Sequence, residues 1–225
     1  ADGYAVELYT GGKWNEVFRT SDSSVTSCTV GSLKADSIYS LRIRAFKDTD
    51  DGTVYSDYTR LAVKTKLANV AGLKAQGVTA TAVKLDWARN AGATGYIIEQ
   101  YKGGKWTQIA VTKNNYTLTF TVKGLAECTP YSFRVKAYKN DGGKTNYSDY
   151  VTVKASTLLG TVKNAKVTST TGTWITLGWD RNTGATGYVL EQYKGGRWTE
   201  IAVTKNNTTL KFTVKGLRND TTYSF

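Results

Sequence analysis

Several residue types are scarce in this chain of 225 residues, which has no histidine, no methionine, one proline and two cysteines. Without histidine, neither a Ser-His-Asp triad nor an imidazole metal site can be built. No run of about 18 apolar residues is present, so no membrane span is predicted. The glycine-rich GGK segments lack the spacing of a phosphate-binding loop. We therefore expect no catalytic residue, no metal site and no cofactor.

One hairpin-like phrase is written three times. Residues 93–106 read ATGYIIEQYKGGKW, residues 185–198 read ATGYVLEQYKGGRW, and residues 1–14 read ADGYAVELYTGGKW. The interval is 92 residues throughout, and a leucine (33, 125, 217) and a tyrosine (39, 131, 223) keep it. An interval held without insertion marks a repeat array. A unit of this length is large enough to be a small domain with its own core.

Apolar residues of the complete middle repeat alternate with polar ones, which predicts strands. The alternating runs lie near residues 83–87, 96–99, 117–122, 131–137 and 151–154. Each run buries one face and exposes the other, as the two sheets of a sandwich require. Gly103-Gly104 is predicted to form a two-residue turn that places Tyr101 opposite Trp106. No helical periodicity reaches 12 residues, so the repeat is predicted to be all-β.

These residues carry a resemblance to the fibronectin type III domain. In the middle repeat they are Trp87 in KLDW, Tyr96 in TGY, Trp106 and Ile109 in KWTQI, and the run 117–138, TLTFTVKGLAECTPYSFRVKAY. Leu125 followed six residues later by Tyr131 is similar to the tyrosine corner of such sandwiches. The third repeat matches through Trp179, Tyr188, Trp198, Leu217 and Tyr223, and the first through Tyr4, Trp14, Leu33 and Tyr39. Proline is a departure, because the family usually carries several and Pro130 is the only one here.

The resemblance implies an all-β chain of tandem fibronectin type III-like (immunoglobulin-like) β-sandwiches, one complete and two truncated. The expected domains are residues 1–66 with strands C to G, 67–158 as a complete repeat, and 159–225 with strands A to early F. We expect these residues to be a window on a longer array. In the alternative, neighbouring chains supply the missing strands, and the incomplete end domains self-assemble. The joints at 66–68 and 158–160 are short, which favours a semi-stiff rod.

The two cysteines fall at different phases of the repeat. Cys28 occupies the position of Phe120 and Phe212, which predicts a core site. Cys128 occupies the position of Asp36 and Asp220, which predicts a loop. A bridge would have to join unlike positions of two repeats, so both are predicted to be free thiols.

Charged residues point to two interpretations of one sheet face. The net charge is +12 with a pI near 9.5, but the cations are spread over every repeat, so no specific nucleic-acid partner is expected. Alternation predicts an outward row of aromatic and basic side chains that could bind a glycan or an anionic polymer. The candidate residues are Tyr101, Trp106, Arg134, Lys136, Tyr138, Tyr193 and Trp198. In the other interpretation, which recurrence at sheet positions favours, Glu99 pairs with Arg134 or Lys136 while Tyr101 covers Trp106.

One acidic segment, KDTDDG at residues 47–52, could be a partial calcium loop. The matching KNDGGK at residues 139–144 keeps a single acid. A solvated turn is therefore the favoured interpretation.

The sequence leaves three functional hypotheses. The first is a non-catalytic spacer array whose partners are the neighbouring domains of a longer extracellular, cell-surface or secreted bacterial protein, as the resemblance to modules of such proteins implies. The second is an adhesion or glycan-binding module with cell-wall polymer or polysaccharide as partner. The third is an accessory region of a carbohydrate-active enzyme whose catalytic domain lies elsewhere.

Overall fold

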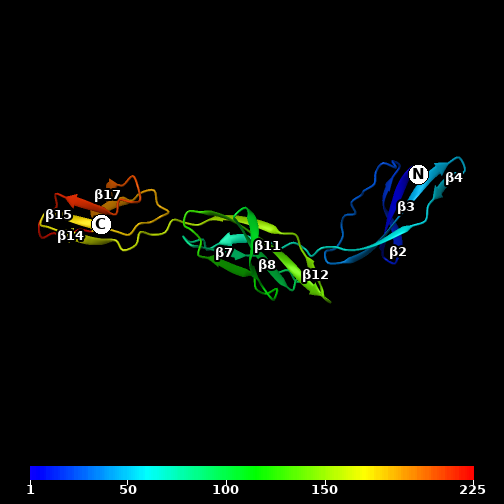
Figure 1. The fold of residues 1–225 in the computed structure, drawn as a ribbon, viewed down its shortest axis with the longest axis horizontal. Coiled ribbons are helices and arrows are strands. Elements are labelled where there is room, and N and C mark those ends of the chain that lie inside the picture. The colour runs from blue at the N-terminus through cyan, green and yellow to red at the C-terminus, as the bar shows by residue number, and fades with distance from the viewer. The chain divides into compact units, whose positions relative to one another are not determined.

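The computed structural model describes residues 1–225 and contains β-strands and no helix (Figure 1). The all-β prediction is therefore confirmed. Contacts divide the chain into two compact units. The first unit comprises residues 1–73, 87–118 and 133–152, and the second comprises residues 74–86, 119–132 and 153–225. No helix capable of crossing a bilayer is found.

The first unit begins with a five-stranded antiparallel sheet. Its strands are β1 (Gly3–Thr10), β2 (Lys13–Thr20), β3 (Ile38–Thr49), β4 (Gly52–Tyr55) and β5 (Thr59–Lys64). Their order is β2-β1-β3-β4, and β5 also pairs with β3. Figure 1 labels β2, β3 and β4 of this sheet near the N-terminus. The apolar positions of β1 and β3 make the core of this sheet, where Ala5, Val6, Leu8 and Phe46 are buried.

A second five-stranded sheet has the same strand order. It contains β8 (Gly95–Lys102), β9 (Lys105–Val111), β11 (Pro130–Asp141), β12 (Lys144–Tyr147) and β13 (Val151–Ser156). The order is β12-β11-β8-β9, with β13 paired to β11. Tyr96, Ile98, Phe133 and Val135 on β8 and β11 are fully buried. The fixed sequence interval thus builds the same sheet twice.

The second unit contains smaller sheets. Strands β6 (Lys74–Gln76), β7 (Ala82–Asp86) and β10 (Thr119–Lys123) form one sheet in the order β10-β7-β6. Strands β14 (Lys166–Thr170), β15 (Trp174–Gly178) and β18 (Lys211–Lys215) form another in the order β14-β15-β18. A hairpin of β16 (Val189–Lys194) and β17 (Arg197–Val203) completes the unit. The alternation predicted for residues 83–87 is confirmed, because Val83 and Leu85 are buried.

The thrice-written phrase forms a hairpin with the predicted register in each repeat. Tyr101 lies opposite Trp106, with ring centroids 5.3 Å apart at 64°. The turn glycines Gly103 and Gly104 have φ of 59° and 80°, a region that glycine enters without a Cβ penalty. Gly95, at the start of β8, has a different role. A Cβ there would collide with the carbonyl oxygen of Thr112, so this glycine allows two backbones to approach closely.

The predicted tyrosine corner is also confirmed. The hydroxyl of Tyr131 accepts a hydrogen bond from the backbone N of Ala126 at 2.8 Å. Tyr39 and Tyr223 make the same bond with the residues at positions 34 and 218. The residue after the leucine must donate its backbone N–H for this bond, and Lys34, Ala126 and Arg218 carry that group, which a proline lacks.

One prediction about the first repeat is wrong. Cys28, expected in a core, is exposed. Residues 27–31, which hold the repeat positions of β10, are not a strand. Cys128 lies in a turn with φ of 48°, as predicted, and both thiols are free.

Candidate functional site

The outward face of β8 and β11 is organised around one carboxylate. Glu99 lies opposite Arg134 in the register of the two strands. Its Oε2 accepts a hydrogen bond from Arg134 Nε at 2.7 Å, and its Oε1 accepts one from the Tyr150 hydroxyl at 2.5 Å. The Glu99 side chain is 14% exposed. Burial and this hydrogen bond raise the pKa of Tyr150 to about 12.

Aromatic rings and cations alternate along this face, in a set that we call the ladder. The Arg134 guanidinium lies 4.4 Å from the Trp106 ring and 3.8 Å from the Tyr150 ring. Lys136 Nζ lies 4.6 Å from the Tyr150 ring and 4.3 Å from the Tyr147 ring. Each such contact contributes about 0.5–2 kcal/mol, depending on its exposure. The ladder therefore joins β9, β11 and β12 with the residue that precedes β13.

The first sheet carries a second ladder at the same repeat positions. Arg42 lies 4.5 Å from the Trp14 ring and 3.8 Å from the Tyr58 ring, and Arg44 lies 4.7 Å from Tyr58 and 3.7 Å from Tyr55. Glu7, the counterpart of Glu99, accepts hydrogen bonds from Arg42 and from the Tyr58 hydroxyl.

Glu7 remains ionised within this ladder. Burial raises the pKa of Glu7, but the hydrogen bonds from Tyr58 and Arg42 outweigh it and leave the pKa below its ordinary value. The carboxylate is thus a fixed anion between two cations.

The candidate binding residues of the middle repeat fall into this network. Trp106 is half-buried, with Tyr101 against its edge and Arg134 over its face. Tyr138 donates its hydroxyl hydrogen bond to the Thr112 carbonyl oxygen and covers Gly95. The predicted pairing of Glu99 with Arg134 and the cover of Trp106 by Tyr101 are both confirmed. The Arg134 guanidinium covers one face of the Trp106 ring.

The aromatic pair of the third repeat is more open. Tyr193 and Trp198 have ring centroids 5.4 Å apart and are 48% and 51% exposed. Glu191, the counterpart of Glu99, is exposed and forms no ion pair. No cation lies over the Trp198 ring.

Two tyrosines of each ladder were missed by sequence reasoning. Tyr147 and Tyr150 belong to the phrase YSDY at residues 147–150, which recurs as YSDY at residues 55–58. The identical phrase at the 92-residue interval was an available signal. Strand alternation could not place these side chains, because most of the phrase lies between strands.

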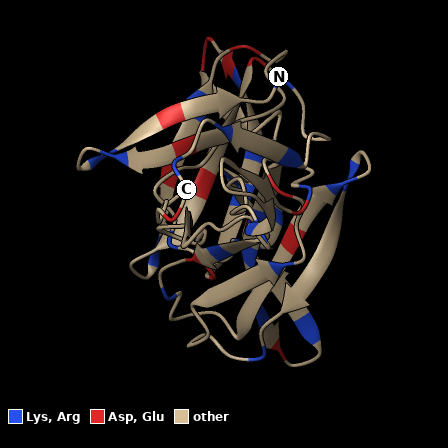
Figure 2. Ribbon diagram, turned by 90° about the vertical axis from the view of Figure 1, so that its left-hand side faces the viewer, with Lys and Arg blue, Asp and Glu red and all other residues tan.

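Charged groups outside the ladders are of both signs. Lys and Arg are interspersed with Asp and Glu along strands and turns (Figure 2). The acidic segment 47–52 forms the turn between β3 and β4, in which Thr53 donates to Asp48 at 2.7 Å. No group of three or more acidic or cysteine side chains is placed to hold a metal ion.

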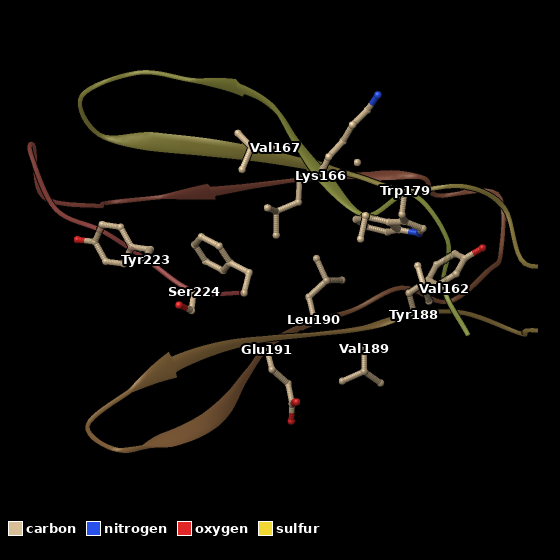
Figure 3. Close-up of a pocket in the computed structure, with 14 residues that line it drawn as sticks. Val162, Lys166, Val167, Trp179, Tyr188, Val189, Leu190, Glu191, Tyr223 and Ser224 are labelled. Atoms are coloured by element: carbon tan, nitrogen blue, oxygen red, sulfur yellow. The ribbon is translucent and has the colours of Figure 1, made fainter. Parts of the chain in front are cut away.

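A cavity of about 540 Å³ lies in the third repeat (Figure 3). Its lining is mainly apolar and includes Val167, Leu177, Trp179 and Leu190. Leu190 points into it, whereas Glu191 points away, as strand alternation requires. The cavity is an open part of the hydrophobic core of this repeat.

Comparisons with known proteins agree with this geometry. Residues 68–154 match the family model described as "Fibronectin type III domain". Chitinase A1 of Niallia circulans is 34% identical over 166 residues, covering 68% of this chain and 22% of that protein. Exoglucanase B of Cellulomonas fimi is 29% identical over 222 residues, covering 90% of this chain and 19% of that protein.

The same fold is seen in a solved two-domain segment of chicken tenascin. Its TM-score is 0.50 at 20% identity, and the match covers 68% of this chain and 85% of that segment. The segment consists of two fibronectin type III domains. At this identity the likeness concerns the fold alone.

Proposed function

From the match of residues 68–154 to the fibronectin type III family, and from the fold of tandem β-sandwiches, we propose that this chain is a non-catalytic spacer in a longer, secreted polysaccharide-degrading protein. Its partners are the neighbouring domains of the same chain. It acts outside the cell, where the polysaccharides are found. Its work is mechanical, since it holds those domains apart.

The ladders are the observation that carries this proposal. Two successive sheets place the same carboxylate, cations and aromatic rings at the same positions, and these groups bind one another. Residues that could bind a ligand instead bind one another across the strands and stabilise the sheet. A surface whose best binding groups are already paired suits a load-bearing element better than a receptor.

The relatives support the accessory position. The chain spans less than a quarter of the length of the curated relatives it matches, a chitinase and an exoglucanase. A segment shared by two enzymes with different names is more readily explained as a connecting region than as a catalytic one.

Small-angle X-ray scattering tests the spacer role. A compact chain of 225 residues would have a radius of gyration of about 17 Å. A spacer must give a value well above this, unchanged by dilution. A value near the compact one, or hydrolysis of chitin or cellulose by the purified chain, would rule out the proposal.

A second candidate is weak binding of polysaccharide by the third repeat, favoured by the exposure of Tyr193 and Trp198. Retention on insoluble chitin and cellulose measures it. Trp198→Ala should abolish retention if the open ring binds, while Trp106→Ala is the matched control at a covered ring. No retention of the unmodified chain would dismiss this candidate.

A further inference from the structure

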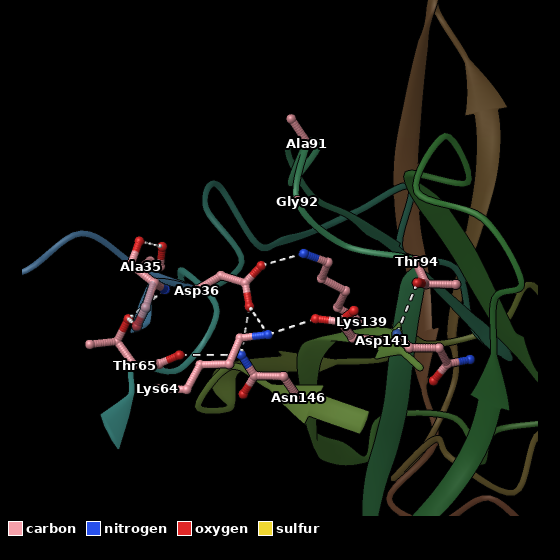
Figure 4. Close-up of polar contacts among 12 residues, drawn as sticks. Ala35, Asp36, Lys64, Thr65, Ala91, Gly92, Thr94, Lys139, Asp141 and Asn146 are labelled. Carbon is pink, nitrogen blue, oxygen red and sulfur yellow. Dashed lines mark hydrogen bonds and ion pairs between the residues drawn. The ribbon is translucent and has the colours of Figure 1, made fainter. Parts of the chain in front are cut away.

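A cluster of alternating charges joins the two large sheets of the first unit. Asp36 precedes β3 in a turn and has a φ of 51°. Its carboxylate reaches side chains of β11 and β12, where Oδ2 accepts a hydrogen bond from Lys139 Nζ at 2.6 Å and Oδ1 accepts one from Asn146 Nδ2 at 2.9 Å (Figure 4).

Lys64, at the end of β5, extends the cluster. Its Nζ lies 3.1 Å from Asp36 Oδ1 and 2.8 Å from Asp141 Oδ2. Two cations and two carboxylates therefore alternate across the joint (Figure 4). Asn146 adds a neutral contact by donating to the Thr65 carbonyl oxygen at 3.2 Å.

A more exposed pair lies beside this cluster. Lys66 Nζ lies 2.6 Å from Asp149 Oδ1, and both side chains are more than half exposed. Exposed pairs contribute about 0–1 kcal/mol each. The backbone N of Asp149 also donates to Asn69 Oδ1 at 3.0 Å. These contacts add to the joint, but they do not dominate it.

Asp36 is the central group because it is shielded. Its side chain is 16% exposed, so water screens its pairs less than it screens the outer one. Hydrogen bonds from Lys139 and Asn146 lower its pKa to about 2. The carboxylate is therefore ionised at neutral pH.

We propose that the Asp36 cluster is an ionic latch that fixes the sheet containing β3 to the sheet containing β11 in one orientation, and that raising the salt concentration opens it. This property goes beyond the spacer role, which requires only length. It makes the stiffness of the first joint dependent on ionic strength.

The corresponding position of the next repeat lacks the latch. Cys128 stands there in place of an aspartate. The neighbouring Glu127 accepts a hydrogen bond from the backbone N of Gly160 at 3.0 Å and forms no ion pair. The third repeat restores the acid as Asp220, also with a left-handed φ of 52°, but that side chain is exposed and unpaired. Asp220 is thus a matched control for Asp36.

The two native thiols allow the latch to be tested in the unaltered chain. Cys28 and Cys128 are both free and exposed, and they belong to successive repeats of the sequence. Nitroxide labels on them report an inter-repeat distance distribution by double electron–electron resonance. We compare the unmodified chain with Asp36→Asn, Lys139→Met and Asp220→Asn at low salt and at about 1 M salt, where the Debye length is about 3 Å.

The expected result is a narrow distribution for the unmodified chain and for Asp220→Asn at low salt. Asp36→Asn and Lys139→Met each remove one charge of the cluster and leave its partner unpaired. Each should therefore broaden the distance distribution about twofold. High salt should broaden the unmodified chain and change Asp36→Asn little. Asparagine tolerates the left-handed region, so folding should be retained. Equal widths for Asp36→Asn and the unmodified chain, or equal broadening by Asp220→Asn, would overturn the latch, whereas the spacer role would stand on the scattering result.

Discussion

Removal of the Glu99 carboxylate should loosen the middle sheet. In Glu99→Ala, Arg134 loses its ion pair and the Tyr150 hydroxyl loses its acceptor. The two side chains of the ion pair are 14% and 24% exposed. Both lost partners were bound to an ionised group, and each such hydrogen bond contributes about 1.5–3 kcal/mol.

The net cost is smaller than the sum of these bonds. Arg134 keeps its contacts with the Trp106 and Tyr150 rings, and partial exposure lets water replace some of what is lost. Breaking a fully buried pair costs about 3–5 kcal/mol. For this half-shielded pair we expect a loss of about 2–3 kcal/mol in the free energy of opening, which is roughly 30- to 150-fold in the opening equilibrium.

Native-state hydrogen exchange measures this locally, since unfolding of a multi-domain chain is not one transition. Amides of β8 and β11 should exchange faster in Glu99→Ala, while those of β15 and β18 should not change. Glu191→Ala is the matched control, because Glu191 holds the same repeat position but is exposed and unpaired. Unchanged protection in β8 and β11, or an equal loss in β16 of the control, would refute the claim that the carboxylate organises the ladder.

Three further predictions concern backbone, charge and domain limits. Gly95→Ala should lower the free energy of opening of the middle sheet by about 3 kcal/mol, because the new Cβ meets the Thr112 carbonyl oxygen, whereas Gly92→Ala meets only ordinary contacts and should be nearly neutral. Native-state hydrogen exchange of the β8 amides in both variants tests this, and equal protection would contradict it. The pKa of Asp36 is lowered from 3.8 to about 2, so its contribution to stability, about 1–2 kcal/mol after screening, should be complete above pH 3.8 and lost as the pH falls through about 2. The difference in thermal stability between the unmodified chain and Asp36→Asn should therefore shrink over that range, and a constant difference would show that Asp36 is not the titrating group. Residues 67–158, produced alone, should unfold in one cooperative transition when monitored by circular dichroism, because the proposed boundaries enclose a complete sandwich. A gradual transition would contradict those boundaries.

The alternation of side chains was enough to predict the middle strands and the hairpins. The Gly-Gly turns set the register, and a register fixes every cross-strand pair, including Tyr101 with Trp106 and Glu99 with Arg134. The tyrosine corner followed from its spacing. These features depend on contacts between neighbouring strands, and the sequence records such contacts as a local pattern.

Only the tertiary structure decided the remaining features. Cys28 is exposed although it holds the repeat position of Phe120 and Phe212. Tyr150 reaches the Glu99 carboxylate, and Asp36 meets Lys139, across 51 and 103 residues of sequence. Such contacts arise from how the sheets and their connecting segments pack, and side-chain alternation carries no information about packing between segments so far apart. The strands were thus determined by the sequence, while the ladder tyrosines and the latch were determined by the fold.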